Sequence, residues 1–577
     1  MQLVGTISGE VSPTNFNVAL SNMSVGKGSY VKINHEDYGW VLARITDIKR
    51  SINASGEEVV LAKAYTIGYK LDNVVRVPKT PFKPMDRVYS ADGELIMAVV
   101  GLKRARAGNI YLGILEGCSI PVYVDLNKTI RKHMSVLAMT GAGKSYTVGV
   151  ILEELLKNDI PVVIVDPHRE YQSLKYENDD YDNMLAFGVR PVSYASMISE
   201  FTTNPATNPD AKRLSLNLQF DVEELSAIMP VKLADKQKMI LYNALRRLEG
   251  KEYTLQDLIN NVRLEKGKDL WKVISVLESI QKSGLFDVKP VTAKDLVKTG
   301  RASIIDLKGS EPWIQQLVVT RIAKDLFAAV KLNELPAFFF LIEEAHNFCP
   351  ERGFGEALSS EILRTIASEG RKFGLHLCVV SQRPARVDKN VLSQCNTQII
   401  LKVTNPNDLR AIGQSIEGFT SGMESDIRQL SVGQAMVVGE SVEQPITVNI
   451  RARETKHITA VEAKGKVSEG AKRQMLDKIK PMFVEEKTPE VEMPVPDAKA
   501  KGGKGIIKKL TPVFIGDAKP AKAAEKKAEE KTEPEAGQKK GSGAERPKQR
   551  PEKAKKKGLS NKLIGLFLKD EEEMRKR

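Results

Sequence analysis

The sequence predicts an α/β protein in which a parallel β-sheet covered by helices follows a small β-barrel. From about residue 120, continuous apolar strands such as "PVVIVD" alternate with helices such as "YTVGVILEELLKN". This alternation is typical of a parallel sheet that is buried on both faces. Before that point, short strands with alternating polarity are separated by turns, which indicates a barrel that closes its own edges. After about residue 456, Lys, Glu, Ala, Pro and Gly predominate, which predicts a disordered tail.

The barrel is expected over residues 1–118. Its strands lie within "YVKINHEDYGWVLARITDI", "EVVLAKAYTIGY", "RVYSADGELIMAVVGL" and "NIYLGILEG". The Asp-Gly pair in "ADGE" (91–94) predicts a hairpin turn, because Asp-Gly favours the tight turn between two antiparallel strands.

The core is expected in two parts, residues 119–204 and 301–455, separated by a helical insertion over 205–300. The insertion is predicted from helical patterns such as "LADKQKMILYNALRRLEG" and "DLWKVISVLESIQKSG". The sheet pattern returns at Ala302 with "ASIIDL" and continues through "AFFFLIEEAH" and "LHLCVVSQRP".

The tail, residues 456–577, carries most of the charge of the chain. The formal net charge is +14, and residues 501–577 alone contribute +11, so the first 500 residues are nearly neutral. A nucleic-acid surface in the folded part must therefore be a local patch. Near the C-terminus, Leu559, Leu563, Leu566 and Phe567 share one helical face. This segment fits a docking helix for a partner and residual local structure equally well.

The four cysteines form no CxxC pair and show no metal-finger spacing. This pattern is typical of small buried residues in a reducing compartment. The N-terminus lacks the pattern of a signal peptide, and no apolar run approaches the roughly 20 residues of a membrane span. We therefore expect a cytoplasmic protein with no membrane partner.

A phosphate-binding loop is predicted at "AMTGAGKSYT" (138–147), between a strand and a helix. Gly141 and Gly143 allow the backbone N–H groups to point at phosphate oxygens, and the helix dipole adds positive potential. Lys144 would reach the β- and γ-phosphates of ATP, and the Ser145 hydroxyl would bind Mg²⁺. The residues of this segment predicted to contact the nucleotide are Thr140, Gly141, Ala142, Gly143, Lys144, Ser145 and Tyr146.

Acidic residues follow two of the apolar strands, where ligands gather at the carboxyl ends of a parallel sheet. In "VVIVDPHREY", Asp166 or Glu170 could face the nucleotide, and a capped strand end explains Asp166 equally well. In "FFFLIEEAH", Glu343 and Glu344 can both reach the site only if the strand ends there. We assign Glu343 to the metal and Glu344 to the attacking water.

Further along, "LCVVSQRPARV" ends a strand with Gln382 and Arg383, and Gln382 could hydrogen-bond the γ-phosphate or the water. Arg371 precedes that strand, where an arginine could complete the site of a neighbouring subunit. The segment "LSVGQ" (430–434) is similar to the signature of ABC-type ATPases. It follows Glu343 by nearly ninety residues and leads into a strand, so we interpret it as a turn.

Together these motifs resemble the archaeal HerA family of hexameric DNA translocases, in the FtsK–HerA branch of the RecA-like P-loop ATPases. The similarity is carried by "TGAGKSYTVGVILEEL", "VVIVDPHREY", "LIEEAHNFCPE", "EGRKFG" and "SQRPARVDKNVLSQCNTQIILKV", over roughly residues 1–455. Departures are Ala138, where the family usually has Gly, and Arg169, where "DPHGEY" is common. The barrel is similar to the HAS barrel of the family, and the Glu-Glu pair matches its Walker B strand.

This resemblance implies a homo-hexameric ring that hydrolyses ATP with Mg²⁺ between subunits and threads double-stranded DNA through its lumen. It also implies partnership with a NurA-like nuclease in DNA end resection and recombinational repair. An arginine would act in trans, at Arg371, with Arg383 and then Arg131 as alternatives. Lys232, Lys236, Lys238 and Arg352 are guesses for DNA contacts. Two other hypotheses are a RecA-like ring that acts on protein substrates, as an unfoldase or secretion motor, and a scaffold that uses ATP only to assemble.

Overall fold

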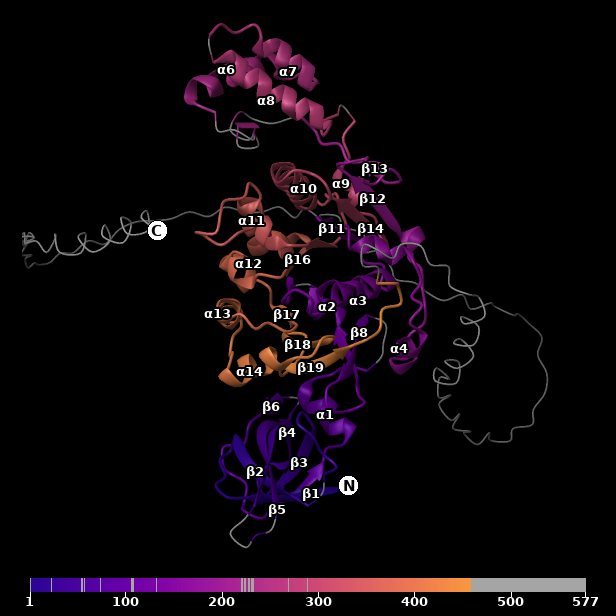
Figure 1. The fold of residues 1–577 in the computed structure, drawn as a ribbon, viewed down its shortest axis with the longest axis vertical. Helices are drawn as coiled ribbons and strands as arrows, with labels where there is room; N and C mark the ends of the chain where they lie inside the picture. Colours follow the sequence, from indigo (N-terminus) through magenta and orange to yellow (C-terminus); the bar gives the residue numbers. More distant parts are fainter. Residues whose placement is uncertain are drawn as a thin grey trace, which may run out of the picture. The chain divides into compact units, whose positions relative to one another are not determined.

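A closed β-barrel forms the first part of the chain (Figure 1). The computed structural model describes residues 2–457, without 22, 53–55, 57, 73, 105–107, 131, 219–221, 223–224, 227–228, 230–232, 268 and 288. The barrel strands follow the order β2-β1-β7-β3-β4-β5, and β2 also pairs with β5, which closes the sheet on itself. The strands are β1 (Leu3–Ser8), β2 (Asn15–Leu20), β3 (Tyr30–His35), β4 (Gly39–Ile52), β5 (Glu58–Leu71) and β7 (Arg87–Ser90). The short strand β6 (Val74–Arg76) pairs with the end of β5 in the antiparallel direction.

The predicted hairpin at residues 91–94 is wrong, because helix α1 (Gly93–Val100) follows β7 directly. The Asp92 carboxylate accepts a hydrogen bond from the backbone N–H of Leu95, so it caps this helix. Ile96, Val99 and Val100 are buried at helical spacing. The Asp-Gly pair is therefore the start of a helix here, where it had suggested a tight turn.

The second sheet contains both parts of the predicted core. Its order is β13-β12-β14-β11-β15-β16-β10-β17-β18-β19-β8-β9, and neighbouring strands from β13 to β17 are parallel. The parallel strands are β10 (Met134–Leu137), β11 (Val162–Asp166), β12 (Ile198–Thr202), β13 (Lys212–Arg213), β14 (Ala302–Asp306), β15 (Phe338–Ile342), β16 (Leu375–Ser381) and β17 (Thr397–Ile400). Every residue of β10, β11, β14 and β15 is buried, as the continuous apolar runs predicted.

Four antiparallel strands extend this sheet beyond β17. They are β18 (Gln434–Gly439), β19 (Ile446–Ile450), β8 (Asn109–Leu115) and β9 (Pro121–Asp125). Strand β8 was expected in the barrel, because its alternation matches the strands before it. Its pairing with β19 places it in the second sheet.

Helices cover the sheet and connect its strands. The main ones are α3 (Lys144–Lys157), α10 (Pro312–Lys331), α11 (Ser360–Glu369), α13 (Pro406–Ser415) and α14 (Ser421–Gln429). The shorter helices are α2 (Leu126–Ile130), η1 (Tyr171–Lys175), α4 (Tyr181–Ala186), η2 (Ala195–Met197), η3 (Ala345–Asn347), η4 (Gly370–Phe373), η5 (Pro384–Arg386) and α12 (Lys389–Ser393).

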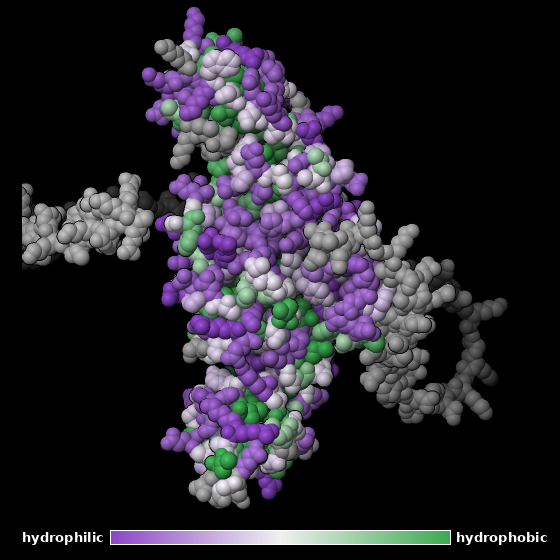
Figure 2. Space-filling model, viewed as in Figure 1, coloured by the Kyte–Doolittle hydropathy of each residue, from purple (hydrophilic) through white to green (hydrophobic). Residues whose placement is uncertain are grey.

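The helical insertion is confirmed between β13 and β14. Helices α6 (Asp235–Leu248), α7 (Leu255–Val262) and α8 (Leu270–Ser283) pack against one another (Figure 1), and α9 (Ala293–Leu296) leads back to β14 at Ala302. On the face of the chain in Figure 2, hydrophilic residues cover most of the described surface. Within the described residues, no helix has the length and apolar character that crossing a membrane requires. The predicted tail lies outside the described residues beyond His457.

Candidate nucleotide hydrolysis site

The glycine-rich loop lies between β10 and α3, as the sequence predicted. Gly143 caps α3 with φ 96°, a left-handed conformation that glycine adopts without strain. A cavity of about 760 Å³ opens beside this loop, a size typical of small-molecule sites. The loop residues that line it are Met139, Thr140, Gly141, Gly143, Lys144, Ser145 and Tyr146.

Lys144 joins the loop to the acidic pair. Its ammonium group contacts Glu343 Oε1 and donates a hydrogen bond of 2.9 Å to Glu344 Oε1. All three side chains are buried. Burial lowers the pKa of Lys144, but the two neighbouring carboxylates outweigh this effect, so its pKa is raised. Lys144 therefore stays charged and lies between the two carboxylates.

The end of β15 explains how both glutamates reach the site. Strand β15 ends at Ile342, and Glu344 has φ 51°, which is uncommon for a residue with a side chain. Such strained conformations cluster at functional sites. The chain turns sharply at Glu344, so two consecutive side chains both contact Lys144. The sequence required the strand to end here if both glutamates were to reach the site, and β15 does end here.

Gln382 links Glu344 to the glycine-rich loop. Its Nε2 donates a hydrogen bond of 2.7 Å to Glu344 Oε1, and its Oε1 accepts one from the hydroxyl of Thr140. Glu344 Oε2 is buried without a hydrogen bond to any described residue. His346 Nδ1 lies 3.2 Å from this oxygen, and burial lowers the pKa of His346. Glu344 thus has one oxygen held in place and one available to accept a proton.

Glu343 is enclosed on all sides. Its Oε2 accepts a hydrogen bond of 2.5 Å from the hydroxyl of Tyr171, and its side chain has no exposed surface. Burial raises the pKa of Glu343 to about 7, although Lys144 and Tyr171 act in the opposite direction. Pairing alone would lower this pKa. Complete burial has the larger effect, because removing this carboxylate from water costs more than its contacts with Lys144 and Tyr171 return.

Ser145 contacts a third carboxylate. Its hydroxyl donates a hydrogen bond to Glu170 Oε2, and both residues line the cavity. Mg²⁺ prefers oxygen ligands and is bound in ATPases by one or two protein groups together with phosphate oxygens. The oxygen atoms of Ser145, Glu170 and Glu343 fit this preference. No cluster of three or more metal-ligating side chains occurs among the residues that the structure describes.

Asp166 lies at the end of β11 without lining the cavity. Its carboxylate accepts hydrogen bonds from the backbone N–H groups of His168 and Tyr171, at 3.2 and 3.0 Å. Burial raises its pKa to about 6. These contacts match the capped strand end, one of the two roles that the sequence left open. Arg131 lies outside the described residues.

The other two predicted arginines lie at opposite ends of strand β16. Arg383 follows β16 directly beside Gln382 and is exposed. Arg371 is also exposed but precedes β16, in a cavity that also includes Lys132 and His376. Strand β16 has seven residues, which at about 3.3 Å per residue separates its ends by about 20 Å. Arg371 therefore cannot reach the glycine-rich loop of its own chain.

Several cavity residues were not found from the sequence. The predicted turn at "LSVGQ" is confirmed, but it also forms one wall of the cavity. No local sequence pattern predicts this wall, because it forms only when β18 pairs with β17 and β19 pairs with β18. The remaining residues that line the cavity and were not predicted are Asp180, Asn183, Phe187, Ser431, Val432, Gly433, Gln434, Asn449, Ile450 and His457.

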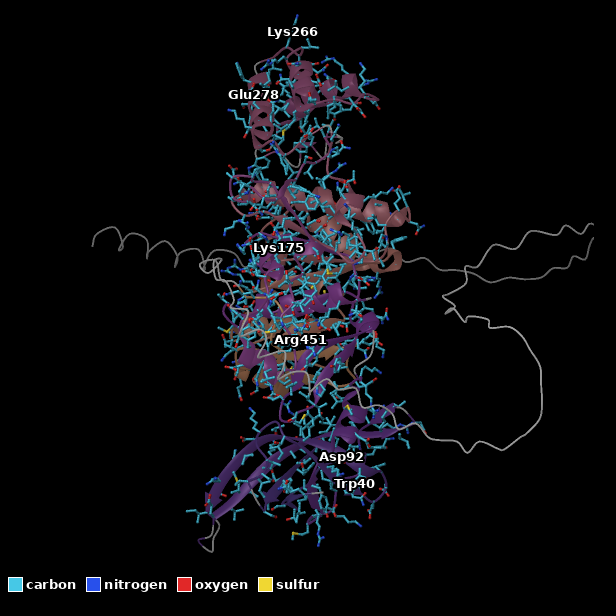
Figure 3. All side chains as sticks on the ribbon, turned by 90° about the vertical axis from the view of Figure 1, so that its right-hand side faces the viewer. Trp40, Asp92, Lys175, Lys266, Glu278 and Arg451 are labelled. Atoms are coloured by element: carbon cyan, nitrogen blue, oxygen red, sulfur yellow. The ribbon has the colours of Figure 1, made fainter. Side chains whose placement is uncertain are left out.

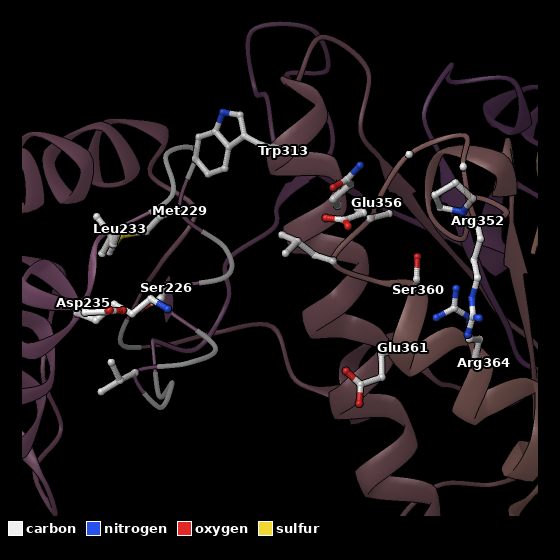
Figure 4. Close-up of a pocket in the computed structure, with 18 of the residues that line it drawn as sticks. Ser226, Met229, Leu233, Asp235, Trp313, Arg352, Glu356, Ser360, Glu361 and Arg364 are labelled. Carbon is white, nitrogen blue, oxygen red and sulfur yellow. The ribbon is translucent and has the colours of Figure 1, made fainter. Parts of the chain in front are cut away.

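Two of the guessed DNA-contacting residues line a separate cavity. Lys238 of α6 and Arg352, which follows β15 and η3, contribute to the walls of a space of about 1380 Å³. Figure 4 shows Met229, Leu233 and Asp235 on one side of it and Arg352, Glu356, Glu361 and Arg364 on the other. Lys236 does not line this space, and Lys232 lies outside the described residues.

The parallel sheet, the glycine-rich loop and the Lys144–Glu344–Gln382 contacts define a P-loop ATPase. Residues 110–326 match the family described as "Helicase HerA, central domain", and residues 4–83 match the HAS barrel domain. The chain belongs to the HerA helicase family.

Relatives of known name are similar over most of the chain. This chain is 27% identical over 512 residues to the probable DNA double-strand break repair helicase HerA of Methanocaldococcus jannaschii, and the alignment covers 77% of this chain and 94% of that protein. It is also 25% identical to the DNA double-strand break repair helicase HerA of Pyrococcus furiosus, and that alignment covers 78% of this chain and 92% of the relative. Among solved structures, VirB4 of Thermoanaerobacter pseudethanolicus is 16% identical with a TM-score of 0.44, covering 60% of this chain and 97% of that chain.

Proposed function

We propose that this protein is an ATP-driven motor that translocates along double-stranded DNA and unwinds it during DNA repair. The contact of Lys144 with Glu344, and of Glu344 with Gln382, carries the proposal. It joins a phosphate-binding group, a carboxylate and an amide at neighbouring strand ends. The named relatives, which are DNA double-strand break repair helicases, favour DNA as the substrate over a protein.

Lys144 is the group that nucleotide binding would redirect. Its ammonium is shared by the carboxylates of Glu343 and Glu344. A bound triphosphate offers the same ammonium more negative charge, so Lys144 would leave the carboxylates for the β- and γ-phosphates. This exchange frees Glu344 only when ATP is present, which would restrict hydrolysis to the loaded site.

Glu344 is the proposed general base, and Gln382 positions it. Oε2 of Glu344 has no hydrogen bond within the described part of the chain and can accept the proton of the attacking water. Gln382 holds the other oxygen and contacts Thr140 in the glycine-rich loop. Mg²⁺ would be held near Ser145, Glu343 and Glu170 and would neutralise charge on the phosphate oxygens.

We also propose a homo-oligomeric ring, a hexamer, in which Arg371 completes the site of a neighbouring subunit. Its exposure, and its position about 20 Å from the strand end near its own loop, suit a residue that acts on another chain. Arg383 lies beside Gln382 and suits a contact within its own site. Lys238 and Arg352 are candidates for salt-sensitive contacts to DNA phosphates. Partnership with a NurA-like nuclease completes the proposal.

The deciding experiment is the ATPase rate with and without duplex DNA at low and high salt. We expect stimulation by DNA that weakens as salt increases, because phosphate contacts release counterions. A rate that DNA does not change at any salt concentration would contradict the translocase. In a parallel assay, Glu344→Gln should bind ATP normally but lose about 10²- to 10⁴-fold in turnover, the usual contribution of a general base. A scaffold would retain its biological activity with this substitution.

A further inference from the structure

The cavity beside the glycine-rich loop extends well beyond the phosphate-binding residues. Its remaining walls contain three aromatic rings, those of Tyr146, Phe187 and His457. The amides of Asn183 and Asn449 line the same space and can donate and accept hydrogen bonds. Apolar and aromatic walls with a few polar groups are typical of a site for a flat organic ring. Phosphates alone would not need such walls.

Two of these rings are held in a fixed arrangement. The centroids of Tyr146 and His457 lie 5.5 Å apart with an interplanar angle of 72°, a favourable edge-to-face contact. The hydroxyl of Tyr146 accepts a hydrogen bond of 2.9 Å from the backbone N–H of Arg453. The backbone carbonyl of Phe187 accepts one of 3.1 Å from the hydroxyl of Tyr111. The Tyr146 ring and the backbone of Phe187 are therefore held by contacts with Arg453 and Tyr111, which do not line the cavity.

His457 reaches the cavity on a strap, which we define as residues 451–457. Arg451 and Arg453 of this strap are fully buried (Figure 3 labels Arg451). Arg451 forms ion pairs of 2.9 Å with both Glu153 and Glu154, and Arg453 lies 3.6 Å from Glu153. These glutamates belong to α3, the helix that begins with Lys144. The strap is thus attached to the helix of the glycine-rich loop.

Buried charges of this kind specify position more than they add stability. Separating either partner would leave a charge without compensation in a dry environment. Glu153 also accepts hydrogen bonds from the backbone N–H groups of Glu454 and Thr455, at 3.1 and 2.9 Å. Gly149 leaves the space that the guanidinium of Arg453 needs, since a Cβ there would lie 2.6 Å from its central carbon. The network fixes where His457 meets Tyr146.

We propose that Tyr146, Phe187 and His457 form the binding site for the base of ATP, with His457 delivered by the strap. This inference rests on the proposed ATPase function and adds the part of the site that recognises the organic half of the nucleotide. The glycine-rich loop binds the triphosphate, and the strap closes the aromatic pocket around the base. Because the strap is attached to α3, the two halves of the site keep a constant separation.

The test compares ATP with inorganic tripolyphosphate, which carries the phosphates without the base. Binding of both is measured by calorimetry on the full chain with Mg²⁺, for the wild type, Tyr146→Ala and His457→Ala. Each substitution should weaken ATP binding by about 5- to 150-fold, the range of base–aromatic stacking. Binding of tripolyphosphate should change by less than about twofold. Exposed Tyr176→Ala and His168→Ala are matched controls that should change neither.

The possible outcomes separate this inference from the proposed function. Unchanged ATP affinity in both variants overturns the base site. An equal loss for ATP and tripolyphosphate also overturns it, because the residues would then act on the phosphate half. If Tyr146→Ala unfolds, Tyr146→Phe keeps the ring and should retain most of the ATP affinity, so a large loss in it would count against stacking. A wild type that binds neither ligand refutes the ATPase itself.

Discussion

Replacing Lys144 with Met should destabilise the nucleotide-free protein in a pH-dependent way. The ammonium group is buried against two buried carboxylates, and its removal leaves them without a counter-charge. Breaking a buried ion pair in this manner costs about 3–5 kcal/mol. A substitution normally used to abolish ATP binding would therefore also change the free energy of unfolding.

The pH dependence follows from Glu343. Its pKa is raised by burial from 4.5 to about 7 in the folded protein, so the folded state binds a proton more tightly than the unfolded state does. The associated stability, about 3.5 kcal/mol at 1.4 kcal/mol per pKa unit, is fully present below pH 4.5 and is lost as the pH rises through 7. Without Lys144 the pKa rises further, and the loss extends to higher pH.

Urea unfolding at pH 5.5, 7.0 and 8.5, followed by the fluorescence of Trp313 with the other two tryptophans replaced by Phe, measures this effect. We expect the difference between wild type and Lys144→Met to be about 3–5 kcal/mol at pH 8.5 and to shrink towards pH 5.5. Exposed Lys331→Met is the control and should cost no more than about 1 kcal/mol at every pH. A difference that does not vary with pH would refute the reasoning.

Three further predictions concern other contacts. Gly149→Ala should destabilise the protein by about 1–3 kcal/mol in thermal unfolding, because the added Cβ would meet the guanidinium of Arg453 at 2.6 Å. Gly422→Ala is the control and should not, because its Cβ would lie 3.7 Å from the hydroxyl oxygen of Thr420. Gln382→Ala should lower the ATPase turnover by about tenfold or more while leaving ATP affinity within about threefold, since it loses the contact that orients the base. Mixing Arg371→Ala with Lys144→Ala subunits should restore part of the ATPase activity at mixed interfaces. Inactive mixtures at every ratio would exclude a role in trans.

The features predicted from the sequence are those with a local signal. The glycine-rich loop needs only consecutive residues between a strand and a helix, and the Glu343–Glu344 pair ends a continuous apolar run. Both lie where expected, and Gln382 contacts the pair as its position at a strand end suggested. The parallel character of the sheet follows from the same strands, because they alternate with helices. The order of the strands, with β10 between β16 and β17, has no such local signal.

The features that were missed depend on contacts between distant segments. Nothing near His457 indicates that it reaches a cavity formed more than 300 residues earlier in the chain. Strand β8 has the same alternation as the barrel strands, so only its pairing with β19 assigns it to the second sheet. The hairpin prediction at Asp92 failed for a different reason, because an Asp-Gly pair occurs both in tight hairpin turns and at helix starts.

The position of β8 affects how the chain folds during synthesis. Strand β8 ends at Leu115, and its neighbour β19 is completed only at Ile450. At about 5–20 residues per second, ribosomes need roughly 20–70 s to produce the intervening chain. During that time the β8–β9 hairpin has one edge without its final partner, and such an edge can pair with other nascent chains. Expression at high ribosome density should therefore favour aggregation through this hairpin, and chaperones that cover strand edges should reduce it.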